Sequence, residues 1–290
     1  MTNTIFFGSS IYSVIILKKL IKLPDFPLTT IVTKPDKPVG RHQTVTANPV
    51  AQFAVKHQIP LLQPPSFNSS FVKQLRSLHP HLILVVAYGP PFFTPDIINL
   101  PKYKIVNIHP SPLPRYRGAT PGPWQIINNE KQSAVTFFQI DPQPDHGPII
   151  CQIPFPISPT ATADSFYRQA FQLATDKLNT TLSDYVSNPN KLLHQDHSKK
   201  TYFPKLTKNN AQIKWNWSAI KIEHFVRALT PWPIAWTYVK SQTGQKLKMK
   251  IFSAQVKNKQ LVPLSVQIEG KNTTDWSQIK NYYTIISSSH

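Results

Sequence analysis

The stretch HLILVVAY, residues 81–88, decides the fold of this chain. Its apolar side chains fall on both faces, as they do in a central strand of a parallel sheet that is covered on both sides. Similar apolar runs at 4–8, 28–33, 104–109, 134–140 and 148–152 are interspersed with helical patterns at 11–21, 49–57 and 161–185. This arrangement predicts an α/β fold with a Rossmann-like, open, parallel-rich sheet.

The last third of the chain has a different pattern. Periodicity fails between 186 and 205, where Ser, Asn, Pro, His and Lys dominate, as is typical of linkers. Beyond it come five of the six tryptophans, a helical pattern at 218–229, and alternating strand patterns at 235–240, 245–252 and 260–268. We therefore expect a first domain over 1–186, a linker over 187–205, and a small OB-like β-barrel domain over 206–290.

The composition limits the compartment. No apolar run reaches the roughly 20 residues that span a bilayer, and no charged region precedes the apolar segment 5–20 as in a signal peptide. The single cysteine, Cys151, cannot form an internal disulfide and suits a reducing compartment. We expect a cytoplasmic protein that does not attach to membranes.

The distribution of charge indicates a nucleic-acid partner. The chain carries 32 Lys and Arg against 13 Asp and Glu, a formal net charge of +19. Residues 1–200 contribute 19 basic and 10 acidic side chains, whereas residues 201–290 contribute 13 and 3, so the last 90 residues carry +10. A basic excess in one region is what contact with a phosphate backbone requires, although a chain that simply contains few acids is the alternative.

Motifs for nucleotides and metals are missing. The sequence contains neither GxGxxG nor GxxxxGK[ST], which argues against a dinucleotide or nucleoside triphosphate site. HQDH at 194–197 lies in the expected linker with no further cluster of metal ligands nearby, so we interpret it as a solvated segment and expect no metal.

The densest chemistry follows the strand expected at 104–109. Asn107 and His109 lie near its carboxyl end and point to the same face, because side chains alternate along a strand. The loop DPQPDHGP after the next strand can bring the carboxylate of Asp145 to the same edge of the sheet. An amide donor, an imidazole and a carboxylate together suit acyl transfer without a covalent intermediate, although a strand-end histidine with a structural role remains an alternative.

The same residues carry a family resemblance. NIHPSPLPRYRG at 107–118, followed by DHGP at 145–148, resembles the 10-formyltetrahydrofolate-dependent formyltransferases. The segments TKPDKPVGRHQTVTANPV at 33–50, VVAYG at 85–89, TYFPKLTKNNAQIKW at 201–215 and VRALTPWPIAWT at 226–237 resemble the methionyl-tRNA-specific branch of that family. The resemblance extends over about residues 4–283.

The resemblance implies transfer of a formyl group from 10-formyltetrahydrofolate to the α-amino group of methionyl initiator tRNA, by a monomer without a metal. It assigns catalysis to Asn107, His109 and Asp145. It assigns the folate site to Ser111, Pro112, Leu113, Pro114, Val86, Ala87, Tyr88, Gly89 and Ile140. It assigns tRNA binding to Arg41, Lys205, Lys208, Lys214, Arg227, Lys246 and Lys248.

Two features depart from the family's pattern, and two other functions stay open. Pro112 stands where the family has a residue with a backbone N–H, and His146 stands where it has a small residue. Sugar-nucleotide N-formyltransferases share the three catalytic residue types, but they have no need of a tail with a charge of +10. A non-catalytic RNA-binding relative is the other alternative, and the intact Asn, His and Asp set argues against it.

Overall fold

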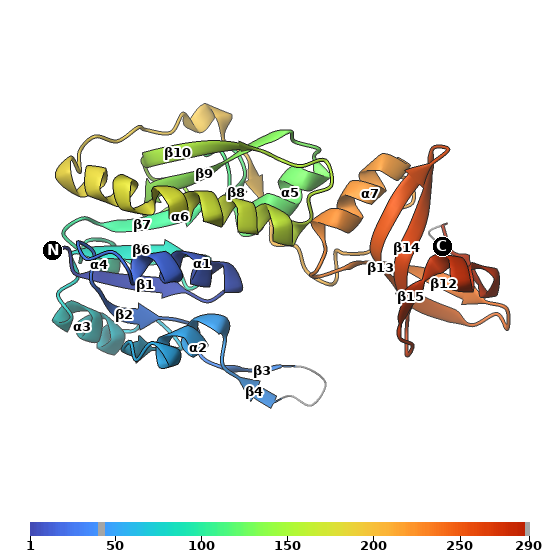
Figure 1. The fold of residues 1–290 in the computed structure, drawn as a ribbon, viewed down its shortest axis with the longest axis horizontal. Helices are drawn as coiled ribbons and strands as arrows, with labels where there is room; N and C mark the ends of the chain where they lie inside the picture. Colours follow the sequence, from blue (N-terminus) through green and yellow to red (C-terminus); the bar gives the residue numbers. More distant parts are fainter. Residues whose placement is uncertain (40–43, 288–290) are drawn as a thin grey trace. The chain divides into compact units, whose positions relative to one another are not determined.

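The computed structural model describes residues 1–39 and 44–287 (Figure 1). The chain divides into two compact units. The first comprises Met1–Gly118, Ala134–Phe155 and Arg168–Tyr202, and the second comprises Ala119–Ser133, Pro156–Tyr167 and Phe203–His290. Across the described residues, no helix combines the length and the apolarity that crossing a bilayer requires.

The first unit is built on a seven-stranded sheet with the strand order β10-β9-β7-β6-β1-β2-β5. Four adjacent pairs, β1–β2, β1–β6, β2–β5 and β6–β7, are parallel, while β7 and β9 are antiparallel. The strands are β1 (Thr4–Gly8), β2 (Leu28–Val32), β5 (Leu61–Leu62), β6 (Leu82–Val86), β7 (Ile105–His109), β9 (Gln132–Gln139) and β10 (Ile149–Pro156). The predicted parallel-rich α/β class is confirmed.

Several helices begin where a polar side chain satisfies free backbone N–H groups. Ser10 and Ser13 form a capping box at the start of α1, Asn48 caps α2, and Asn68 caps α3. The helices of the chain's first two thirds are α1 (Ile11–Leu20), α2 (Pro49–Lys56), α3 (Ser69–Ser77), α4 (Pro95–Ile98), α5 (Pro121–Ile127) and α6 (Ala163–Ser187). Figure 1 shows α1 in front of the central strands of the sheet.

The core of the first unit lies on both faces of the central strands. On β1, Ile5 and Phe7 belong to a buried cluster with α3 and α4 side chains such as Phe71 and Ile97. Phe6, between them, is also fully buried and points to the opposite face. All five β6 residues are buried too, which explains the continuous apolar run in the sequence. The polar residues that follow these strands therefore lie at an edge of the sheet.

The second unit contains a five-stranded antiparallel sheet with the order β15-β14-β13-β12-β16. Its strands are β12 (Ala235–Ser241), β13 (Lys246–Lys257), β14 (Gln260–Ile268), β15 (Thr273–Asp275) and β16 (Tyr283–Ile285). Helix α7 (Ala219–Ala228) packs on α5, β13 and β14. A small antiparallel β domain at this end of the chain is thus confirmed.

Several short elements complete the chain. They are the hairpin strands β3 (Lys37–Val39) and β4 (Thr44–Thr46), β8 (Arg117–Gly118), β11 (Tyr202–Phe203), α8 (Trp276–Ile279), and the 3-10 turns η1 (His197–Lys199) and η2 (Lys280–Tyr282). β8 is joined to the stretch before β11 by a hydrogen bond from the Arg117 N–H to the Thr201 carbonyl, at 2.9 Å. The segment 193–202 is therefore attached to the motif that follows β7.

Candidate active site

Asn107 and His109 occupy the carboxyl half of β7. The register pairs Asn107 with Val85 on one neighbouring strand and His109 with Thr136 on the other, so both side chains lie on one face. His109 is buried, whereas Asn107 is partly exposed. Within the described part of the chain, the Asn107 side-chain amide has no hydrogen-bond partner. Its N–H groups are therefore free to donate to a bound molecule.

The hydrogen bond of His109 determines which ring nitrogen can react. Nε2 lies 3.0 Å from the carbonyl oxygen of Tyr116, and a carbonyl only accepts, so Nε2 carries a hydrogen. In the neutral ring, Nδ1 is then the unprotonated nitrogen. Nδ1 lies 3.7 Å from Oδ1 of Asp145. The geometry therefore lets His109 take up a proton at Nδ1 beside a carboxylate.

Asp145 is held in the loop between β9 and β10. Its Oδ2 accepts a hydrogen bond from the Gly118 N–H at 2.8 Å, which leaves Oδ1 facing His109. Asp145 has φ of 50°, a left-handed conformation that non-glycine residues adopt rarely and that Asp tolerates better than most. This conformation at a charged loop residue fits a position whose side-chain direction matters.

Gly147 explains why the motif after Asp145 needs glycine. A Cβ atom on Gly147 would lie 1.9 Å from the carbonyl oxygen of Gln139. Beside it, the Gln139 N–H donates to the carbonyl of Pro148 at 2.9 Å, so the loop closes tightly where β9 ends. No side chain fits this approach without moving the loop that carries Asp145.

The SPLP turn, residues 111–114, is fixed from below by side chains of β9 and β10. The Ser111 carbonyl accepts from Thr136 Oγ1 at 2.6 Å, and the Leu113 carbonyl accepts from Gln152 Nε2 at 3.1 Å. Ser111 Oγ donates to the carbonyl of Arg115, the residue directly after the turn, at 2.9 Å. Ser111 and Leu113 are buried, while Pro112 and Pro114 are partly exposed. The two prolines are thus the members of this turn that a ligand can reach.

The chain turns sharply after β6. Ala87 and Gly89 have φ of 47° and 72°, so the backbone leaves the sheet immediately beyond Val86. Tyr88 is 3% exposed and its hydroxyl finds no partner among the described residues, while burial raises its pKa to about 12. The Lys34 ammonium lies 3.9 Å from the centre of the Tyr88 ring. The Tyr88 side chain is therefore uncharged at neutral pH, and the Lys34 ammonium lies over the face of its ring.

Ile140 lies where β9 leads into the Asp145 loop. Its N–H donates to the Ile105 carbonyl at 2.8 Å, and its partly buried side chain packs against the buried cluster of Leu113, Phe138 and Ile149. This apolar packing connects the start of the Asp145 loop with the cluster to which Leu113 of the SPLP turn belongs. The structure describes every residue expected in the folate site.

The segment 194–197 contributes to this region, which the sequence reasoning missed. We expected a solvated segment, and this interpretation is wrong at Gln195, which is 6% exposed and hydrogen-bonded to Arg117 at 2.6 Å. His197 stacks on His146, with ring centres 3.9 Å apart. Burial lowers the pKa of Arg117, and the charges of nearby carboxylates raise it again. No local signal in the sequence marks Gln195 as buried, because the residues around it are polar.

Of the seven residues expected to bind tRNA, the structure describes six, and all six lie in the second unit. Lys205, Lys208, Lys214 and Lys246 are exposed, and Lys248 is partly exposed. The register of β12 and β13 pairs Tyr238 with Lys248 and Lys240 with Lys246, so these side chains share one face of the sheet. The ammonium of Lys248 lies 4.1 Å from the Trp236 ring centre, and that of Lys246 lies 4.3 Å from the Tyr238 ring centre.

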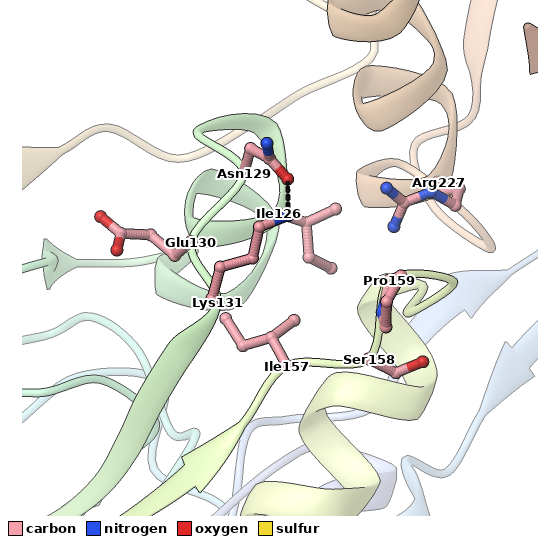
Figure 2. Close-up of a pocket in the computed structure, with 8 residues that line it drawn as sticks. All are labelled: Ile126, Asn129, Glu130, Lys131, Ile157, Ser158, Pro159 and Arg227. Carbon is pink, nitrogen blue, oxygen red and sulfur yellow. Dashed lines mark hydrogen bonds between the residues drawn. The ribbon is translucent and has the colours of Figure 1, made fainter.

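The remaining two residues differ from this group. Arg227 is held by Glu223 Oε1 at 2.6 Å and by the Ala161 carbonyl at 2.6 Å. Figure 2 shows it above Ser158 and Pro159 at a small hollow, whose volume of about 10 Å³ holds at most one water molecule. Arg41 lies outside the described residues, so its predicted contact with tRNA stays a prediction.

Together, these groups supply what transfer of an acyl group between two nitrogen atoms requires. They are a free amide donor, a histidine with an open ring nitrogen, and a carboxylate held against it. Within the described residues, no group of three or more His, Cys, Asp or Glu side chains could hold a metal ion. Such a set of groups suits an acyl-transferring enzyme.

Comparisons with known proteins agree with this class. Residues 8–182 match the formyl transferase family, and residues 205–263 match the formyl transferase C-terminal domain. The methionyl-tRNA formyltransferase of Acetivibrio thermocellus is 34% identical over 250 residues, which cover 86% of this chain and 79% of the relative. The chain belongs to the methionyl-tRNA formyltransferase family.

Solved structures show the same fold. A methionyl-tRNA formyltransferase from Clostridium thermocellum superposes with a TM-score of 0.61 at 15% identity, over 92% of this chain and 99% of that one. An N-formyltransferase from Helicobacter canadensis, in complex with folinic acid and dTDP-3-aminofucose, gives 0.62 at 21% identity, over 89% of each chain. At these identities the likeness concerns the fold alone.

Proposed function

We propose that this protein transfers the formyl group of 10-formyltetrahydrofolate to the α-amino group of methionyl initiator tRNA. The observation that carries the proposal is the contact between His109 and Asp145 beside the free amide of Asn107. The family of the chain, and its relative from Acetivibrio thermocellus with 34% identity, support the choice of reaction and acceptor.

Asn107 stabilises the charge that develops during transfer. When the amine attacks the formyl carbon, a C–N bond forms and the electron pair of the C=O bond moves to oxygen. The Asn107 side-chain N–H groups donate to this oxygen. Because they have no hydrogen-bond partner among the described residues, no existing hydrogen bond has to break first. We propose this as the main role of Asn107.

His109 and Asp145 move the proton. The attacking nitrogen must lose a proton and the leaving N10 must gain one as the C–N10 bond breaks. We propose that Nδ1 of His109 holds this proton between the two events, directly or through water, while the Asp145 carboxylate stabilises the imidazolium. The Tyr116 carbonyl keeps the ring oriented throughout by binding Nε2.

The proposed folate site combines the backbone after β6, the SPLP turn and Ile140. Backbone groups at 86–89 lie beyond the end of β6, and Ile140, whose N–H donates to the Ile105 carbonyl at the start of β7, adds a partly exposed apolar side chain. We propose that Val86–Gly89 and Ile140 bind the pterin ring, and that the SPLP turn (Ser111, Pro112, Leu113 and Pro114) forms an adjoining wall. Ser111 and Leu113 support this wall from within, because both are buried.

The basic second unit fits the tRNA. Lys246 and Lys248 lie on one face of the sheet, and Lys205, Lys208 and Lys214 are exposed before α7. We propose that these lysines bind phosphates, with a steep dependence of affinity on salt. Arg41 and Arg227 belong to the same proposal, and Arg227 is hydrogen-bonded to Glu223 in this structure. We place this reaction in the cytoplasm and expect a monomer.

A formyl-transfer assay tests the proposal. The purified protein is given 10-formyltetrahydrofolate with methionylated initiator tRNA, and in parallel with a 4-amino sugar nucleotide. Formylation of the tRNA is the expected result. Formylation of the sugar alone would keep the reaction and reject the acceptor, and binding of tRNA without any transfer would reject the enzymatic function.

A further inference from the structure

Gln195 is a buried glutamine in a stretch whose composition is that of a linker. It is 6% exposed, although Ser, Asn, Pro, His and Lys dominate around it. A buried amide destabilises a protein unless its donors and its acceptor are satisfied. Here the amide is satisfied on both sides. Its Nε2 donates to the carbonyls of Asp145, at 3.0 Å, and Gly147, at 2.7 Å, and its Oε1 accepts from Arg117 at 2.6 Å.

The two carbonyls that Gln195 binds are those of a strained loop. Asp145 has φ of 50°, which favours glycine, so this backbone needs outside support to persist. One carbonyl belongs to Asp145 itself and the other to Gly147, two residues further on, so both hydrogen bonds hold the backbone directly after the Asp145 Cα. Fixing these carbonyls fixes the direction in which the carboxylate leaves the backbone. The carboxylate can then bind the Gly118 N–H through Oδ2 and face His109 through Oδ1.

A second contact attaches the same segment to the same loop. Arg117 Nη2, which binds Gln195, also donates to Nδ1 of His197 at 2.8 Å. The His197 ring stacks on His146, whose Nδ1 lies 2.5 Å from Asp141 Oδ2. Two side chains of the segment, two apart in sequence, thus contact three consecutive residues of the Asp145 loop: Gln195 binds Asp145 and Gly147, and His197 stacks on His146 between them. This arrangement restricts the loop more than one hydrogen bond could.

We propose that Gln195 is a positioning residue for formyl transfer, which holds the Asp145 loop so that its carboxylate stays against His109. Gln195 itself touches neither substrate, and its effect passes through the backbone of Asp145 and Gly147. The kinetic test of this inference rests on the proposed function. It has a second readout, the Gly118 amide, that does not depend on activity.

The test replaces Gln195 with methionine, which keeps the length of the side chain and removes both hydrogen-bonding functions. Gln125 offers a matched control, because it is fully buried in the second unit, donates to the Pro121 carbonyl at 3.2 Å and accepts from Ser133 at 2.6 Å. Gln195→Met and Gln125→Met are compared for Tm, for kcat and KM with both substrates, and for hydrogen exchange of the Gly118 amide.

We expect both variants to lose thermal stability, but only Gln195→Met to lose activity. Its kcat should fall by at least about 10-fold, because displacing a catalytic group by about 1 Å costs up to about 100-fold, while KM changes little. Its Gly118 amide should exchange faster, since Asp145 no longer holds that N–H. A Gln195→Met protein with unchanged Gly118 exchange would overturn the inference even if Tm fell. Should the natural protein formylate no tRNA, the proposed function fails, and the exchange measurement still decides the role of Gln195.

Discussion

Replacing Gly147 with alanine should lower kcat as well as stability. The new Cβ would lie 1.9 Å from the Gln139 carbonyl oxygen, whereas Cβ atoms essentially never come closer than 3.0 Å to such an atom. The loop must therefore move by at least about 1.1 Å. The partner is a backbone oxygen in β9, held by the sheet, so the displacement falls on the loop that carries Asp145.

The size of the effect follows from that displacement. A shift of about 1 Å in a reacting group can lower a rate by about 100-fold, which corresponds to about 2.7 kcal/mol in the activation free energy. Forcing one extra methyl group into a packed site costs about 1–3 kcal/mol of stability. Gly147→Ala should therefore remain folded at low temperature, with kcat reduced by about two orders of magnitude.

Single-turnover formylation at saturating substrate measures this loss, and thermal unfolding measures stability. Gly270→Ala serves as the control. Gly270 has φ of 76° and nothing within 4 Å of its added Cβ, so alanine there strains the backbone without touching the site. Both variants should lose stability, and only Gly147→Ala should lose kcat. Normal turnover by a folded Gly147→Ala protein would refute the argument that this loop positions Asp145.

Three further predictions concern Asn107, Lys34, and the pair Lys246 and Lys248. Asn107→Ala should lower kcat by about 10²–10³-fold with an unchanged Tm, as loss of one oxyanion donor does, and near-full activity would contradict its assignment. Burial, with the charge of Lys37, lowers the pKa of Lys34 to about 8, so between pH 8 and 10.5 the unfolded chain binds more protons than the folded protein. The free energy of unfolding, measured with denaturant, should rise with pH in that window and rise less in Lys34→Met; equal slopes would contradict this. Replacing Lys246 and Lys248 with alanine should reduce the slope of log affinity for tRNA against log salt by about 0.7–0.9 for each phosphate that the variant no longer binds, and an unchanged slope would exclude them.

Much of the fold was predictable because its signals are local. The strand expected at 4–8 is observed at Thr4–Gly8, and the helix expected at 161–185 is observed at Ala163–Ser187. Both have long, regular patterns of apolar residues. α3 was not expected, because its apolar face consists of few residues, and the packing of Phe71 against Phe7 supplies what the pattern lacks.

The composition misled us about Gln195. A polar residue in a polar stretch carries no local sign that it is buried, and its partners Asp145 and Gly147 lie 50 and 48 residues away in the chain. Such a contact exists only after the sheet and the long helix α6 have brought the segment back to the loop. The expected domain limits rest on composition and stay a prediction; contacts distant in sequence group Ala119–Ser133 and Pro156–Tyr167 with the second unit.

The amino-acid sequence alone determined the class of fold and the family, and it predicts which residue types carry the chemistry. Apolar periodicity records which faces are buried, and motifs such as NIHPSPLPRYRG and DHGP are contiguous. Only the tertiary structure decided that His109 presents Nδ1 to Asp145, because the choice depends on the Tyr116 carbonyl binding Nε2. Only the tertiary structure showed that Gln195 binds the loop, since a hydrogen bond between distant segments depends on the fold that brings its two atoms to 3.0 Å from each other.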